Sequence, residues 1–144
     1  MVGDPPELRR YMIAVTPKGL ERERVSPAAF SAFVNDSLRG LGSQPAEGDV
    51  HKYLDAQPHG KTSLLAELRK EPEVVSVLQG TRVPAQRRFN ESPQYALSTT
   101  TLMLVRGKAL NLSVYTLYES AADLDWVRVT TARWIDELLR LNYR

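Results

Sequence analysis

Residues 59–63 read His-Gly-Lys-Thr-Ser, the first place in the chain where residue types and spacing suggest chemistry. A phosphate-binding P-loop follows the pattern G-x-x-x-x-G-K-[ST], because its first glycine lets backbone N–H groups curl around the phosphates. Here that position, five residues before Gly60, is Asp55, whose carboxylate would stiffen the turn and repel a phosphate. We therefore interpret the segment as an ordinary helix start rather than a nucleotide-binding loop.

The two histidines, His51 and His59, lie eight residues apart with Asp49 and Asp55 nearby. Such a group suggests a metal site, but catalytic zinc needs three protein ligands in rigid geometry, and no helical H-E-x-x-H pair is present. We expect both histidines to be solvated loop residues, and we expect no metal or other cofactor. A small hydrolase or other enzyme that uses His51, His59 and nearby aspartates stays as the alternative.

Neither covalent nor acid–base catalysis has an obvious set of residues here. The chain contains no cysteine, which removes disulfides, thiolate nucleophiles and cysteine-ligated metals. No Gly-x-Ser-x-Gly elbow is present, and the hydroxyls of Ser98, Ser113 and residues 99–101 fall in predicted strands, where they suit cross-strand pairing. Asp123 and Asp125 lie in the first turn of a predicted helix, which explains them without catalysis. The sequence therefore favours a protein that is not an enzyme.

Three arginines provide the first of two candidate binding sites. Arg82, Arg87 and Arg88 lie within residues 81–94, the longest segment without periodicity. Guanidinium groups bind carboxylates and phosphates through two parallel hydrogen bonds, so this loop suits a small anionic ligand or a protein partner. Replacing Arg87 and Arg88 with alanine is expected to weaken such binding without lowering the melting temperature.

The second candidate is one face of a strand predicted over residues 109–118. Apolar residues and threonine alternate there with Asn111, Ser113 and Tyr115. A strand of this kind has one face on a core and one half-exposed, which is typical of antiparallel sheets. We expect the half-polar face to contact a partner, with Asn111 and Tyr115 as candidate contact residues.

Length and composition set the remaining limits. A chain of 144 residues with 42% apolar residues forms one domain with an ordinary core. The formal net charge is +2, and the pairs Arg9–Arg10 and Arg87–Arg88 lie far apart, so the clustered footprint of a nucleic-acid-binding protein is missing. No apolar stretch approaches the roughly 20 residues of a membrane-spanning helix. Residues 1–10 lack the basic start and apolar centre of a signal peptide, so both the cytoplasm and the envelope stay open.

Turn and capping residues predict the first elements of the chain. Residues 11–16 form a β-rich run and are predicted to be a strand. Ser26 and Pro27 suit the N-cap and first position of a helix that ends at Gly40. Residues 50–54 are predicted to be a short strand.

The middle of the chain allows two interpretations. We prefer a helix over residues 62–70 that is halted by Pro72 and followed by a strand over residues 74–78 that ends at Gly80. The alternative is a hairpin in which residues 64–69 pair with residues 74–78. The segment is too short for its period to decide between them.

The last third of the chain specifies its fold most clearly. Strands are predicted over residues 96–105 and 109–118, joined by a tight turn in which Gly107 supplies a positive φ. Ser120 and Asp123 have the spacing of a capping box that starts the last helix. The buried stripe of that helix is predicted to consist of Trp126, Thr130, Trp134, Leu138 and Leu141.

The block from Ser98 to Tyr115, followed by residues 123–128 and closing at Asn142, looks like the ending of uncharacterised proteobacterial envelope proteins. Its order of strand, glycine turn, strand and final amphipathic helix is also similar to the Mog1/PsbP-like α/β/α fold, in which helices cover an antiparallel sheet. The resemblance extends over about the last 45 residues, and it implies a binding or assembly subunit without carrying catalytic residues.

Together these observations predict a single α+β domain over residues 1–144. Its sheet is mainly antiparallel, with about five strands covered by about three helices, as in the Mog1/PsbP-like sandwich. The predicted function, reached by elimination, is a non-enzymatic binding or assembly module of the bacterial envelope. It acts through a protein partner or a small anionic ligand, and not through nucleic acid.

Overall fold

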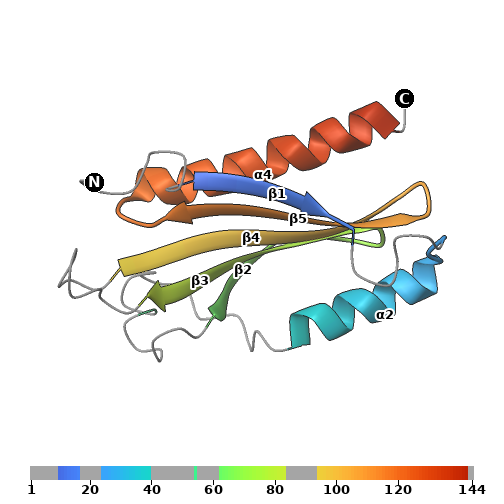
Figure 1. The fold of residues 1–144 in the computed structure, drawn as a ribbon, viewed down its shortest axis with the longest axis horizontal. Coiled ribbons are helices and arrows are strands. Elements are labelled where there is room, and N and C mark those ends of the chain that lie inside the picture. Colours follow the sequence, from blue (N-terminus) through green and yellow to red (C-terminus); the bar gives the residue numbers. More distant parts are fainter. Residues whose placement is uncertain (1–9, 17–23, 40–53, 55–61, 84–93, 143–144) are drawn as a thin grey trace.

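A five-stranded antiparallel sheet forms the centre of the structure, with the strand order β1-β5-β4-β3-β2 (Figure 1). The computed structural model describes residues 10–16, 24–39, 54, 62–83 and 94–142. All four strand pairings are antiparallel, and β1 comes from the start of the chain to pair with β5. The α+β class with a mainly antiparallel sheet is therefore confirmed. The strands are β1 (Arg10–Val15), β2 (Thr62–Glu71), β3 (Val74–Val83), β4 (Gln94–Val105) and β5 (Lys108–Leu117).

Two helices, α2 (Pro27–Leu38) and α4 (Ala121–Asn142), lie on opposite sides of this sheet (Figure 1). Helix α4 packs against alternate residues of β4 and β5, among them Met103 and Leu112. Helix α2 instead contacts residues such as Leu102, which point to the other face because successive side chains of a strand alternate. The described residues thus contain two helices on the sheet, and not the three that the sequence predicts.

Residues 62–70, for which the sequence favours a helix, belong to strand β2 in the structure. This part of the prediction is wrong, and the alternative hairpin with β3 is confirmed. The leucine, alanine, glutamate and lysine content of the segment favours a helix, but intrinsic propensity is a weak prior that tertiary packing overrides. Leu65 shows that packing, because it is buried in one core cluster with Leu78 and Leu97. Pro72 does not halt a helix and instead lies in the turn between β2 and β3.

Strand β3 continues through Gly80 to Val83, past the glycine at which the sequence predicts its end. A Cβ atom at position 80 would lie 2.8 Å from Leu65 Cδ1 and 3.1 Å from Leu54 Cδ2. Glycine is therefore needed here because two leucine side chains approach the backbone closely, and not because the chain turns.

The turn between β4 and β5 has the geometry predicted for it, and it also anchors the start of α2. Arg106 and Gly107 both have positive φ, at 51° and 79°, as a two-residue hairpin turn requires. The Val25 N–H donates a hydrogen bond of 2.7 Å to the Gly107 carbonyl oxygen. Ser26 then caps α2, because its Oγ accepts from the Ala29 N–H at 3.1 Å.

The buried stripe of α4 is displaced from its predicted position. Trp126 and Trp134 are only partly buried and flank the contact with the sheet, and Leu141 is half exposed. The tryptophans mislead the sequence prediction because large side chains at the border of a helix face resemble its centre. The fully buried positions of α4 are Asp123, Val127, Thr131 and Ile135.

Several predicted features lie outside the described residues. They are residues 50–53 of the predicted short strand, Gly40, and both histidines, His51 and His59. Helix α2 itself ends at Leu38, with Arg39 as its C-cap, just before the predicted end at Gly40. Leu54, the last residue of that predicted strand, is described, and its side chain is fully buried with Leu65 and Leu78.

Candidate binding surface

The residues predicted to bind a ligand or partner separate onto two faces of the sheet. Asn111 and Tyr115 lie on the face of β5 that points away from α4, since they alternate with residues packed on that helix. Arg82 is opposite Tyr95 in the β3–β4 register, and Tyr95 packs on the same side as α4. Arg87 and Arg88 lie outside the described residues. The structure therefore places Asn111 and Tyr115 on the same face of the sheet and Arg82 on the opposite face.

The sheet face opposite α4 has an unusual composition. It is formed by alternate residues of four strands. They are residues 11, 13 and 15 of β1, the odd-numbered residues 109–117 of β5, the even-numbered residues 96–104 of β4, and the odd-numbered residues 75–81 of β3. None of these positions carries a charged residue. We call this face, across β1, β5, β4 and β3, the uncharged face. Helix α2 covers the end that holds Val75, Leu102, Leu104 and Ala109, so the exposed part of the face lies on β1 and the adjoining half-buried residues of β5. Glu67 and Lys70 lie on the same side but belong to the far edge strand β2.

Two tyrosines, one from β1 and one from β5, stack on the uncharged face. Tyr11 and Tyr115 are directly opposite in the β1–β5 register, and their rings are 4.6 Å apart with an interplanar angle of 15°. Tyr11 is 43% exposed, and the next two residues of β1 on this face, Ile13 and Val15, are 47% and 48% exposed. Tyrosine is enriched at protein interfaces because it combines a large apolar ring with a polar hydroxyl.

Asn111 has a buried group without a partner on this face. Its Oδ1 atom is shielded from solvent and accepts no hydrogen bond from the residues that the structure describes. Burying an unpaired polar group costs about 1–3 kcal/mol, so the asparagine lowers stability at a position that an apolar side chain of similar size would suit better. Elsewhere on the same face, in register with Tyr115, Gln79 Nε2 donates to Ser98 Oγ at 3.3 Å, which satisfies part of the polar content of this face.

The start of α4 holds a charged cluster that the sequence does not reveal. Asp123 is 3% exposed, and its Oδ2 accepts hydrogen bonds from the Glu119 and Ser120 N–H groups at 2.9 and 3.1 Å. The bond from Ser120 is the carboxylate half of the predicted capping box. Its Oδ1 accepts from Arg10 Nη2 at 3.0 Å. The same guanidinium lies 4.5 Å from the ring centroid of Trp126. Arg10 Nε is buried without a hydrogen-bond partner among the described residues, but the guanidinium contacts both Asp123 and Trp126, so we assign the cluster to fastening β1 to α4.

Buried hydroxyl groups line the sheet beneath α4. Ser76 Oγ and Thr101 Oγ1 are 2.8 Å apart across β3 and β4, and Thr99 Oγ1 and Thr131 Oγ1 are 2.5 Å apart between β4 and α4. All four residues are buried. No described histidine or carboxylate bonds to these hydroxyls, so none has a general base that would make it a nucleophile.

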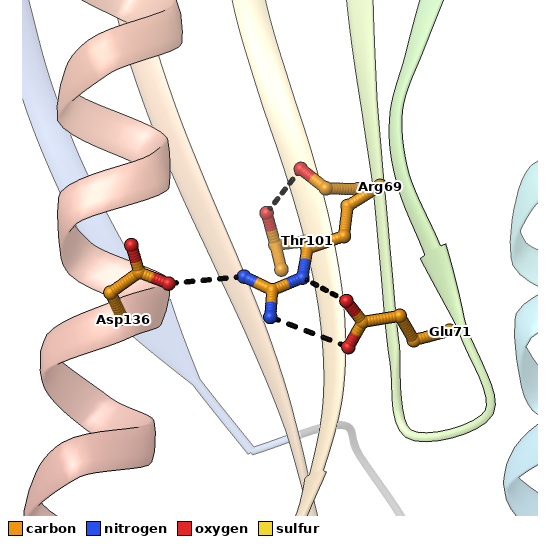
Figure 2. Close-up of polar contacts among 5 residues, drawn as sticks. Arg69, Glu71, Thr101 and Asp136 are labelled. Carbon is orange, nitrogen blue, oxygen red and sulfur yellow. Dashed lines mark hydrogen bonds and ion pairs between the residues drawn. The ribbon is translucent and has the colours of Figure 1, made fainter.

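An arginine connects the far edge of the sheet to α4 (Figure 2). Figure 2 shows the Arg69 guanidinium between Glu71 and Asp136. Arg69 is opposite Ser76 in the β2–β3 register, and Ser76 in turn bonds Thr101. Arg69 Nε donates to Glu71 Oε1 at 2.8 Å, and Nη1 donates to Asp136 Oδ1 at 3.2 Å. The hydrogen bond to Glu71 is the main cause that raises the pKa of Arg69. Both carboxylates pair with this guanidinium, so we assign them to the contact between β2 and α4.

A cavity of about 280 Å³ lies between α2 and the end of the β2–β3 hairpin. Its apolar side comes from Phe30, Val34 and Val75, and Lys70 and Asn35 supply polar groups. The cavity could accept an apolar side chain, but it contains no nucleophile paired with a base.

Within the described ranges, no three histidine, aspartate or glutamate side chains are placed so that they could hold a metal ion. Neither of the two described helices is both long and apolar enough to cross a membrane. The uncharged face, with its stacked tyrosines, is thus the strongest candidate for a functional surface. Comparison with protein families, curated proteins and solved structures finds no match to this chain.

Proposed function

We propose that this chain is a non-enzymatic binding or assembly module whose uncharged face binds a protein partner. The observation that carries the proposal is the composition of that face, where the Tyr11–Tyr115 stack and two exposed aliphatic residues adjoin an area without charge. The cores of protein interfaces are enriched in tyrosine and depleted of charged residues. The resemblance of the last part of the chain to envelope proteins supports the bacterial envelope as its location.

The absence of charge on this face favours a protein partner over a nucleic acid or a small anion. Nucleic acids and small anions bind where lysine and arginine cluster. On this side of the sheet, β2 carries Glu67 and Lys70, which form a pair at 3.9 Å on the far edge strand, and α2 contributes Asp36, which pairs with Arg39 at 2.7 Å. The anionic alternative therefore rests on the arginines at 82, 87 and 88, of which Arg82 lies on the opposite side.

A single arginine placed within the uncharged face tests the proposal. Ser113 lies next to Ile13 in the β1–β5 register and is half-buried, so Ser113→Arg introduces a charge in the middle of the surface. Val129→Arg is the matched control, because Val129 is 47% exposed on α4, on the other side of the sheet. Each variant is first checked for an unchanged melting temperature. Proteins retained from an extract of the source bacterium are then quantified on immobilised wild type and both variants.

The decisive measurement uses the purified partner that this comparison selects. We expect Ser113→Arg to weaken its affinity by about tenfold or more, because a charge would be desolvated without a pair, and Val129→Arg to leave it unchanged. Equal affinity of wild type and Ser113→Arg would remove the uncharged face from consideration. A double variant, Arg87→Ala with Arg88→Ala, tests the anionic alternative, and loss of binding only in that variant would move the site to the arginine loop.

A further inference from the structure

The two edges of the sheet differ in how they are protected. At one edge, β2 carries Glu67, Arg69, Lys70 and Glu71, and its pairing with β3 has two register shifts. Charges and bulges are the features by which natural proteins prevent an edge strand from pairing with another chain. At the other edge, β1 pairs with β5 in an unbroken register, and none of the described strands pairs with its outer side.

Strand β1 has none of the protection found on β2. Residues 11–15 read Tyr-Met-Ile-Ala-Val, without charge or proline. Met12 is 45% exposed on the side of α4, while Tyr11, Ile13 and Val15 are 43–48% exposed on the uncharged face. The one charged residue of the strand, Arg10, is held by Asp123 and Trp126. An unprotected apolar edge with exposed side chains on both faces is suited to accept another strand.

We infer that this edge pairs with β1 of a second copy of the chain, which joins the two five-stranded sheets around a two-fold axis. A two-fold axis perpendicular to the sheet makes the paired strands antiparallel and keeps each face on its own side. When the axis passes through Ile13, this residue lies opposite itself, Tyr11 lies opposite Val15, and Met12 lies opposite Ala14. Every cross-strand pair from 11 to 15 is then apolar.

Charge explains why a second copy is the occupant that fits. In a self-paired strand, a charged residue near the axis would meet its own copy, and the two like charges would repel. Strand β1 has no such residue, because its one charge, Arg10, lies opposite Thr16 in this register. The dimer would also place the two Tyr11–Tyr115 stacks on the same face of the joined sheet, on opposite sides of the axis, and extend the uncharged face across both copies. The dimer does not depend on the proposed partner binding.

Sedimentation equilibrium on the whole chain tests the inference. We expect the wild type to form a dimer, and Ile13→Lys to weaken association by about tenfold or more, because two like charges would meet at the axis. Val129→Lys is the control with the same 47% exposure, and it should dimerise as the wild type does. Circular dichroism and melting of each variant establish that it is folded.

Three outcomes would overturn the inference: a wild type that is monomeric up to its solubility limit, an Ile13→Lys variant that dimerises as tightly as the wild type, or equal loss in Val129→Lys. A monomeric wild type would leave the Ser113→Arg experiment on partner binding unaffected. A second measurement uses the absence of native cysteine. Ile13→Cys should form a disulfide-linked dimer under mild oxidation of dilute protein, because the two residues face each other at the axis, and Val129→Cys should stay monomeric. Equal cross-linking of both would contradict the proposed register.

Discussion

The Asp123 carboxylate connects two segments that lie far apart in the sequence, β1 and the start of α4. One of its oxygens accepts two backbone hydrogen bonds at the start of α4, and the other accepts from Arg10, which lies 113 residues earlier in the sequence. Capping alone is a local interaction, but the bond to Arg10 fixes where β1 meets the helix. The stability of this corner therefore depends on the charge of Asp123 as well as on its ability to accept hydrogen bonds.

Replacing Asp123 with asparagine separates these two roles. The amide oxygen can still accept from the backbone, but the amide N–H₂ then faces the Arg10 guanidinium, and two donors meet. We expect the free energy of unfolding to fall by about 1–3 kcal/mol, less than the about 3–5 kcal/mol of a fully buried pair, because the Arg10 side chain is 37% exposed. Chemical denaturation measures the change.

Asp125→Asn is the matched control for this prediction. Asp125 is exposed in the same helical turn, and the substitution changes the net charge equally. We expect its effect to stay within about 0.5 kcal/mol. Equal losses in the two variants would show that the helix dipole, and not the contact with Arg10, accounts for the effect.

Single residues were predictable from sequence where their role is local. The structure confirms the Ser26 cap and the positive φ of Gly107, and it shows the carboxylate half of the Ser120–Asp123 capping box. Each of these features depends on neighbours a few residues away. The partner of Arg10 was not predictable, because nothing in the spacing of the chain indicates that β1 lies beneath the start of α4. Gly80 was misinterpreted for the same reason, since the leucines that require it come from other elements.

At the scale of elements, a buried hydroxyl pair couples α4 to β4. Thr131 Oγ1 donates to the Val127 carbonyl oxygen at 2.7 Å, so its single hydrogen is already used. Thr99 must therefore be the donor in the 2.5 Å contact between the two hydroxyls. Removing the Thr131 hydroxyl leaves the Thr99 donor without its acceptor, whereas removing the Thr99 hydroxyl leaves no donor unpaired. The two substitutions therefore test the contact between helix and sheet in different ways.

Valine substitutions of these threonines should have unequal effects. Thr131→Val leaves the Thr99 hydroxyl buried without its acceptor and should lower the free energy of unfolding by about 1–3 kcal/mol. Thr99→Val leaves Thr131 bonded to the Val127 carbonyl oxygen and should cost less than about 1 kcal/mol. The double variant should resemble Thr99→Val, because no orphaned donor remains. Equal single effects that add in the double variant would contradict this assignment of donor and acceptor.

A helix or strand was predictable where its own residues determine its secondary structure, and not where pairing with other elements determines it. The β4–β5 hairpin follows from alternation and a glycine turn, and α4 follows from its capping box and periodicity. Strand β2 was not preferred, because its composition favours a helix and only its pairing with β3 makes it a strand. The stripe of α4 was displaced because the two tryptophans border the sheet contact, where their rings are partly buried.

At the scale of the whole molecule, topology creates the candidate surface. Strand β1 crosses from the start of the chain to pair with β5, and this places Tyr11 against Tyr115. The sequence suggested the polar side of β5 as a contact surface, with Asn111 and Tyr115, but it gave no sign that the exposed residues of β1 extend it. It also could not reveal that Arg82 lies on the other side, because the face of a residue depends on strand register.

The same topology makes one edge of the molecule apolar, and this has a thermodynamic consequence. If folded chains pair through β1, the melting temperature must rise with protein concentration, because association stabilises only the folded state. For a chain of 144 residues we expect a rise of about 1–3 °C for each tenfold increase in concentration. Ile13→Lys should melt at a lower temperature than the wild type at each concentration at which the wild type is dimeric, because its association is weaker, whereas Val129→Lys should follow the wild type. A wild-type melting temperature that is constant over a hundredfold range of concentration, measured by calorimetry at a fixed scan rate, would mean that the apolar edge is left unpaired by folded chains.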